Sequence, residues 1–164
     1  MLSLIQVPLA SASSLRYVRF NAEGMSAFSS DFVEKYNTRY YKVGFNGEIT
    51  GDIEGVFDWS DRYIFRCASP PPEDPICSLH KITITISGNI EDKQGTLTIC
   101  ANVYFKYDDA GVSEQKWGTW RIVRGSGELS NFRGSGKLTW GSPYMFEGTI
   151  YEQAALSSRR WFGF

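Results

Sequence analysis

Apolar and polar residues alternate with a period of two through most of this chain. Ile82, Ile84 and Ile86 alternate with threonine and serine, and the segment from Leu97 to Phe105 repeats the pattern. Successive side chains of a β-strand point to opposite faces, so this period predicts strands with one buried and one exposed face. The remaining segments of this kind are 15–20, 41–59, 63–65, 117–124, 134–140 and 144–153. Turn residues separate them, which predicts seven or eight consecutive strands.

Consecutive strands with short turns close most simply into an up-and-down barrel, because closure removes the exposed edges. We therefore predict an all-β fold, a single antiparallel β-barrel of about eight strands, with a β-sandwich as the alternative. One domain would cover residues 1–164, with an N-terminal arm and first strand (1–37), a barrel body (38–153) and a C-terminal tail (154–164). A short helix from Asp31 to Tyr36 is also expected, because Glu34 follows Asp31 at the spacing of a capping box.

Charge and hydropathy exclude two classes of partner. The net charge is −1 and the basic residues are scattered, whereas a nucleic-acid-binding surface needs a basic stripe. No run reaches the roughly 20 apolar residues of a membrane-spanning helix. We expect a cytoplasmic protein, with secretion left open by the mildly apolar residues 1–10.

The cysteines and the histidine predict no metal site and no catalytic group. Cys67 and Cys77 flank a proline-rich loop and are close enough in sequence to be bridged, but three reduced thiols with Cys100 are the preferred interpretation. His80 is the only histidine and opens a strand beside that loop. We interpret it as a partly exposed loop residue, and no spacing predicts a metal site or a bound cofactor.

The segment from Tyr41 to Trp59 has two chemically different faces. Its odd positions are mostly apolar, whereas its even positions include Asn46, Glu48, Asp52 and Glu54. If the even face lined a lumen, a buried carboxyl there would have a raised pKa and could act as a general acid or base. Alternation alone favours the apolar face pointing inward, so the two orientations remain open.

Two stretches resemble a known family. The segment Asn46-Gly47-Glu48-Ile49-Thr50-Gly51-Asp52-Ile53 is similar to an early strand of plant allene oxide cyclases. The segments 125–129 (Gly-Ser-Gly-Glu-Leu) and 134–138 (Gly-Ser-Gly-Lys-Leu) resemble the glycine turns of that family and of a small bacterial barrel family with the same fold. The likeness covers about residues 40–152. It implies a calycin-type barrel, with a homo-oligomer, dimer or trimer, as a further expectation.

The resemblance also implies an activity and a site. It implies cofactor-independent isomerisation or cyclisation of an apolar substrate, in which Asn46 would help hold a water against the substrate oxygen. The family's catalytic tyrosine falls at Val103, so that role would pass to Tyr104 if Tyr104 faced inward. The family's N-terminal Glu-x-Asn pair is matched only in reverse, by Asn21-Ala22-Glu23.

We therefore predict an isomerase or cyclase that folds a polyene- or polyketide-like molecule inside the lumen. Asn46 and Glu48 are the candidate catalytic residues. The candidate ligand-binding residues are Leu97, Ile99, Val103, Tyr104, Phe105, Trp120, Phe146 and Ile150. The alternatives are a non-catalytic barrel that binds a small hydrophobic ligand, and a filled barrel without a ligand.

Overall fold

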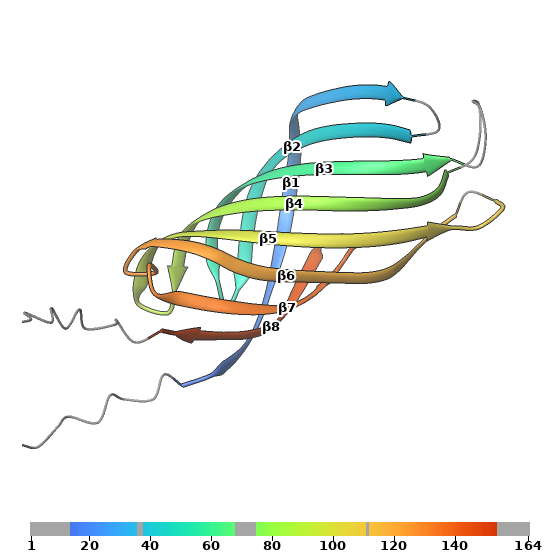
Figure 1. Cartoon of the computed structure of the whole chain (residues 1–164). Helices are drawn as coiled ribbons and strands as arrows, with labels where there is room; N and C mark the ends of the chain where they lie inside the picture. Colours follow the sequence, from blue (N-terminus) through green and yellow to red (C-terminus); the bar gives the residue numbers. More distant parts are fainter. Residues whose placement is uncertain (1–13, 36–37, 68–74, 111, 154–164) are drawn as a thin grey trace, which may run out of the picture.

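The structure is a computed structural model that describes residues 14–35, 38–67, 75–110 and 112–153. It contains eight strands: β1 (Arg16–Lys35), β2 (Thr38–Gly51), β3 (Glu54–Cys67), β4 (Pro75–Ile90), β5 (Lys93–Tyr107), β6 (Ser113–Gly127), β7 (Phe132–Thr139) and β8 (Tyr144–Glu152). Each strand pairs antiparallel with its neighbours in the chain, and β8 pairs with β1 to close the barrel (Figure 1). The prediction of an antiparallel barrel of about eight strands is confirmed. The described residues contain no helix long and apolar enough to cross a membrane.

The helix predicted from Asp31 to Tyr36 is wrong. Residues 31–35 belong to β1, where Asp31 to Lys35 pair with Thr38 to Lys42 of β2. This hairpin satisfies the backbone hydrogen bonds across two strands, and that pairing outweighs a local capping signal of only four residues.

The interior is filled by the apolar face of the strands. The buried core residues of β3 stand at odd positions and those of β4 at even positions. The register explains this, because it places Phe57 opposite Ile86 and Trp59 opposite Ile84. Aromatic rings pack together inside the barrel, where Phe20 stacks on Phe146 at 4.7 Å and meets Trp120 edge-on at 5.5 Å. The odd face of the segment from Tyr41 to Trp59 therefore points inward, as the alternation alone favoured.

A row of four glycines crosses the barrel where the strands curve most closely together. Gly55, Gly88, Gly95 and Gly127 lie opposite one another on β3 to β6. A Cβ on Gly88 would stand 1.8 Å from the carbonyl oxygen of Glu54, and Gly55 and Gly127 have positive φ angles of 152° and 61°. Only glycine fits such contacts, so this row allows the bend that closes this end of the sheet.

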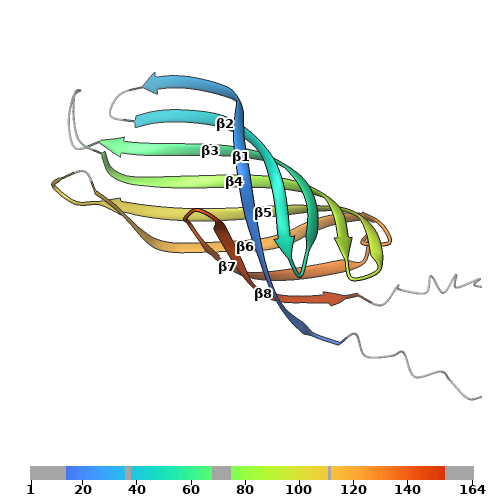
Figure 2. The same cartoon turned by 180° about the vertical axis from the view of Figure 1, so that it is seen from behind.

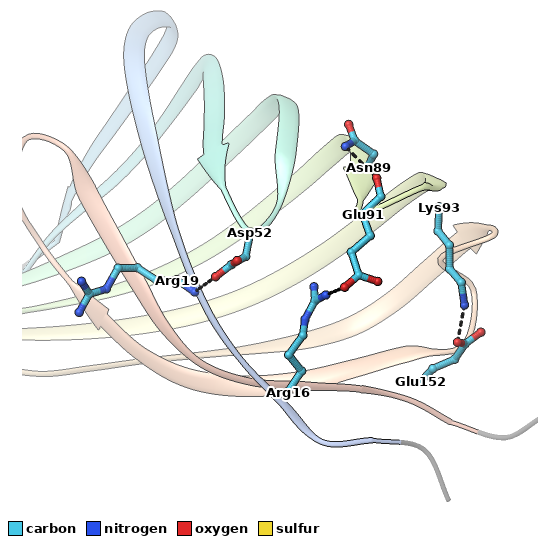
Figure 3. A network of polar contacts seen from close by, with 7 residues as sticks. All are labelled: Arg16, Arg19, Asp52, Asn89, Glu91, Lys93 and Glu152. Atoms are coloured by element: carbon cyan, nitrogen blue, oxygen red, sulfur yellow. Dashed lines mark hydrogen bonds and ion pairs between the residues drawn. The ribbon is translucent and has the colours of Figure 1, made fainter. Parts of the chain in front are cut away.

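The end of the barrel that carries the start of β1 is closed. Its buried residues beside the turns are Ile53, Ile90, Leu129 and Phe132. Polar contacts join distant segments around the same end (Figure 3): Arg16 pairs with Glu91, Lys93 pairs with Glu152, and the backbone N–H of Arg19 donates to Asp52 at 2.7 Å. These contacts are partly or fully exposed, so water and salt screen them and each adds little to stability.

The opposite end is open on one side. There the strands β3 to β6 run on past the turn between β7 and β8 (Figures 1 and 2). Half-buried side chains replace the fully buried core at this end, among them Val43, Phe45, Tyr63 and Tyr107. We call this region the barrel mouth.

Candidate functional site in the barrel mouth

Two ionisable side chains lie on the inner face of the barrel where apolar residues are expected. Asp61 follows Trp59 on β3, and His80 precedes Ile82 on the neighbouring strand β4. Asp61 is 2% exposed and His80 is 7% exposed. Removing a charged group from water costs free energy, so such residues are kept where they pair with each other or serve a function.

Asp61 and His80 belong to a chain of four polar side chains. His80 Nδ1 lies 2.7 Å from Asp61 Oδ2, His80 Nε2 lies 3.3 Å from Ser78 Oγ, and Ser78 Oγ lies 3.2 Å from the hydroxyl of Tyr107. In the tautomer with a proton on Nδ1, His80 donates to Asp61 and accepts from Ser78, while Tyr107 donates to Ser78. The hydrogen bonds then all run in the same direction from Tyr107 to Asp61, which favours proton movement along these four side chains.

Aromatic rings fix the imidazole of His80 on several sides. Tyr63 stacks on it at 4.7 Å, Trp140 approaches it at 4.9 Å, and Phe105 meets it edge-on at 5.3 Å. Such packing holds the ring in one orientation and keeps water away from the face of the ring. A proton-transfer group needs this kind of fixed geometry.

Burial sets the electrostatics of the site. It raises the pKa of Asp61, while the hydrogen bond and the charge of His80 act in the opposite direction. Burial, and then the charge of Asp61, also raise the pKa of Tyr63 and the pKa of Tyr144. Both phenols therefore stay protonated and can donate hydrogen bonds beside the carboxylate.

Two buried polar atoms near this site have no hydrogen-bond partner among the described residues. They are Oδ1 of Asp61 and Nε1 of Trp59, an acceptor and a donor two residues apart on the same inward face of β3. Leaving a buried polar atom unpaired costs about 1–3 kcal/mol. Each of the two atoms therefore indicates a position where a polar group, or a water, would be stabilised.

The mouth contains a pocket of about 240 Å³. Its lining residues are Val43, Phe45, Asp61, Tyr63, Phe65, His80, Phe105, Tyr107, Ser113 and Trp140. The volume lies just below the roughly 300–1,000 Å³ of pockets for drug-sized ligands. The pocket suits a flat molecule of one or two rings, with most of its surface against aromatic side chains.

Gln115 holds the side of the pocket formed by Trp140. Its Nε2 donates to the carbonyl oxygen of Leu138 at 2.6 Å, and its Oε1 accepts from the backbone N–H of Trp140 at 2.6 Å. The β6–β7 ladder pairs only Thr119–Arg121 with Ser135–Lys137, so Gln115 extends this connection to the mouth.

Most of the predicted ligand-binding residues form the core. Seven of them are buried on the inner face: Leu97, Ile99, Val103, Phe105, Trp120, Phe146 and Ile150. Of these, Phe105 lines the mouth pocket. The other six pack against the rest of the core cluster below the mouth.

Asn46, Glu48 and Tyr104 lie on the outer side of the barrel. Asn46 and Glu48 are exposed and pair in register with Asp58 and Val56, so the lumenal position considered for them is not found. Tyr104 is half-buried on the outer face, where it stacks on Trp117 at 5.9 Å. Tyr104 therefore does not face inward, as the role implied by the resemblance would require.

The interpretation of His80 as a partly exposed loop residue is wrong. β4 begins at Pro75, so His80 lies inside the strand and shares the inward face of Ile82. Continuing the alternation of Ile82, Ile84 and Ile86 backwards by one step would have placed it there. The odd-position pattern that ends at Trp59, continued by one step, would likewise have found Asp61.

Cys77 and Cys100 carry free thiols, so the bridge to Cys67 that was left open as an alternative is wrong. Among the described residues, no three His, Cys, Asp or Glu side chains come together as a metal-binding group.

No family model and no curated protein sequence matches the chain. The chain shares its fold with a solved structure. This is the crystal structure of a protein of unknown function from the DUF3224 family of Shewanella oneidensis MR-1, with a TM-score of 0.60 and 11% sequence identity over 88% of this chain and 100% of that chain. At this identity the likeness concerns the fold alone.

Proposed function

We propose that the mouth pocket binds a small, flat, mostly apolar molecule and that His80 and Asp61 exchange a proton with it. The observation that carries this proposal is the buried Asp61–His80 pair, joined at 2.7 Å and lining an aromatic pocket. Asp61 Oδ1 would bind a polar group of the ligand, because Asp61 lines the pocket and this oxygen has no partner among the described residues.

The reaction class that fits is a cofactor-independent isomerisation or ring closure. Such a reaction changes neither the composition nor the oxidation state of the substrate. An imidazole that accepts a proton from one substrate atom and returns it to another therefore supplies the whole acid–base requirement. The aromatic wall would hold the substrate in a reactive conformation and exclude water.

We also propose that the barrel is related to the allene oxide cyclase-like barrels that the glycine-rich segments resemble. The closed ring of eight consecutive antiparallel strands supports this relationship. The site differs, since the proposed acid–base pair comes from β3 and β4 rather than from Asn46 and Glu48.

A barrel that binds the same kind of molecule without reaction is the second candidate. One observation favours it: Nε2 of His80, the nitrogen that does not face Asp61, already lies 3.3 Å from Ser78 Oγ. The substrate would have to displace Ser78, or act through Tyr107 at the other end of the polar chain.

The first experiment identifies what the pocket holds. The protein is purified from its native host and denatured, and the released small molecules are measured by mass spectrometry. We expect one aromatic or polyene compound at near-stoichiometric yield. Val43→Trp, which fills the pocket, should abolish the release, whereas the matched control Val56→Trp on the exposed outer face of β3 should not.

The second experiment separates reaction from binding. The compound class found above is incubated with the wild-type protein and with His80→Gln, and the products are separated by chromatography. A product of unchanged mass and changed retention that His80→Gln does not form supports the isomerase. Retention of the compound by both proteins without a product supports the binding barrel, and release that survives Val43→Trp contradicts the proposed pocket.

A further inference from the structure

A second hollow lies on the outer wall of the barrel, whereas the mouth pocket lies on the inner side, and Tyr63 lines both. The hollow has a volume of about 590 Å³, within the range of small-molecule sites, and extends over the outer face of β1 to β6. Four cations line it, Lys42, Arg62, Lys81 and Arg121, and apolar residues lie beside them.

Three of these cations lie directly opposite one another. In register, Lys42 on β2 faces Arg62 on β3, and Arg62 faces Lys81 on β4. Like charges directly opposite on neighbouring strands destabilise a sheet. On β1, the register partner of Lys42 is Asp31.

Within the described part of the chain, these four cations have no ion-pair partner. Lys42, Arg62, Lys81 and Arg121 are all exposed, and none of them takes part in an ion pair. By contrast, Arg16, Arg19 and Lys93 at the closed end each pair with a glutamate. Arg16, Arg19 and Lys93 are therefore neutralised, whereas the four cations of the hollow are not.

An apolar row runs beside the cations on the same strands. Val33 on β1 faces Tyr40 on β2, and Tyr40 faces Ile64 on β3, each two residues along its strand from the cation row or from Asp31. Val33 is 62% exposed and Tyr40 is 44% exposed, although both are large apolar side chains. All three residues line the hollow.

We propose that this hollow is a binding site for a small amphipathic anion. Its phosphate, sulfate or carboxylate group would lie on the Lys42–Arg62–Lys81 row with Arg121 beside it, and its apolar part on Val33, Tyr40 and Ile64. An arginine can bind such a group through two parallel N–H donors, and the bound anion removes the repulsion within the row. This site is separate from the mouth pocket and does not depend on the proposed acid–base pair.

The test uses dodecyl phosphate as the probe, below its micellar concentration, with binding measured by calorimetry. We expect saturable binding of one molecule per chain. Dodecyl maltoside, which has the same chain without the charge, and inorganic phosphate, which has the charge without the chain, should each bind at least tenfold more weakly.

Two double variants locate the site. Arg62→Gln with Lys81→Gln should weaken dodecyl phosphate at least tenfold. Arg124→Gln with Lys137→Gln removes the same charge from exposed positions of β6 and β7 outside the hollow, and should leave the affinity within twofold. An equal loss in both double variants, no loss in either, or binding of dodecyl maltoside as tight as that of dodecyl phosphate would overturn the proposal. Binding to phosphatidic acid vesicles without binding of the monomeric probe would also overturn it, in favour of a membrane surface.

Discussion

Nδ1 of His80 and Oδ2 of Asp61 lie 2.7 Å apart, on neighbouring strands and inside the barrel. Two aliphatic side chains in place of Asp61 and His80 would pack equally well in a barrel that is filled with apolar residues. Replacing a buried ion pair by apolar residues is in fact often neutral or stabilising. The pair is therefore better explained by what it does in the mouth pocket than by what it adds to stability.

The first prediction concerns the carboxylate. Burial raises the pKa of Asp61 above its ordinary value of 3.8. A carboxyl group with a raised pKa in the folded state stabilises the fold below its unfolded pKa and loses this contribution as the pH rises through the folded pKa. Asn stays neutral and still offers an oxygen to His80 Nδ1. We expect Asp61→Asn to gain stability relative to wild type as the pH rises from about 3.8 toward neutral.

Urea unfolding of both proteins across this range measures the difference. Asp58→Asn, an exposed carboxylate on the outer face of the same strand, is the matched control and should follow wild type. If Asp61→Asn instead loses stability as the pH rises, the carboxylate is a stabilising partner of His80 and the functional interpretation of the pair is weakened.

A second prediction concerns Gln115, which connects β6 to Trp140. Gln115→Ala removes two hydrogen bonds to the backbone and should cost about 1–3 kcal/mol. The amide of Trp140 donates to Gln115, so its hydrogen exchange should become faster than in wild type. Gln94→Ala, at an exposed position near the closed end, should change neither quantity. Unchanged exchange at Trp140 would show that other contacts hold this wall.

The glycine row gives a third prediction. Gly88→Ala places a methyl group 1.8 Å from the carbonyl oxygen of Glu54, so β3 and β4 must separate. Gly24 has a positive φ of 64° but no atom within 4 Å of the added Cβ, so Gly24→Ala carries only the backbone strain. We expect a loss of about 1 kcal/mol for Gly24→Ala and at least twice that for Gly88→Ala in thermal or chemical unfolding. Equal losses would mean that the sheet absorbs the contact by a small shift.

A fourth prediction separates the inner face from the outer face. Phe146→Ala leaves a cavity in the ring cluster with Phe20 and Trp120 and should cost about 3–5 kcal/mol. Asn46→Ala and Glu48→Ala change exposed side chains and should stay within about 0.5 kcal/mol of wild type. Both should also retain the molecule bound in the mouth. Loss of that molecule in either variant would restore the role that the sequence resemblance gave them.

The fold could be predicted from sequence because one signal repeats in nearly every strand. The alternation of Ile82, Ile84 and Ile86 with small polar residues fixes both the strand and its inward face, and the turns fix the order. The exception was Asp31 to Lys35, where a local capping signal competed with pairing to β2. Local signals lose when a partner strand is adjacent, and the sequence does not show that partner.

The candidate site was harder to predict for a different reason. Asp61 and His80 stand at positions where the alternation calls for apolar residues, and a polar residue there looks like the end of a strand. Their proximity depends on the diagonal register of β3 and β4, in which Asp61 faces Ile82 and His80 faces Tyr63. The family resemblance instead drew attention to Asn46, whose exposure follows from the alternation itself.

The most direct test of the account is nuclear magnetic resonance of the imidazole of His80. The chain contains one histidine, so its ring gives a single set of signals and needs no assignment by mutation. Naphthol, a flat two-ring molecule with one hydroxyl group, is titrated into the labelled protein, with naphthalene as the probe that lacks the hydroxyl. The account predicts a saturable shift of the His80 signals with naphthol, a weaker effect with naphthalene, and no difference between the two probes in Asp61→Asn. Unchanged His80 signals at saturating naphthol would contradict the claim that this pocket is the binding site.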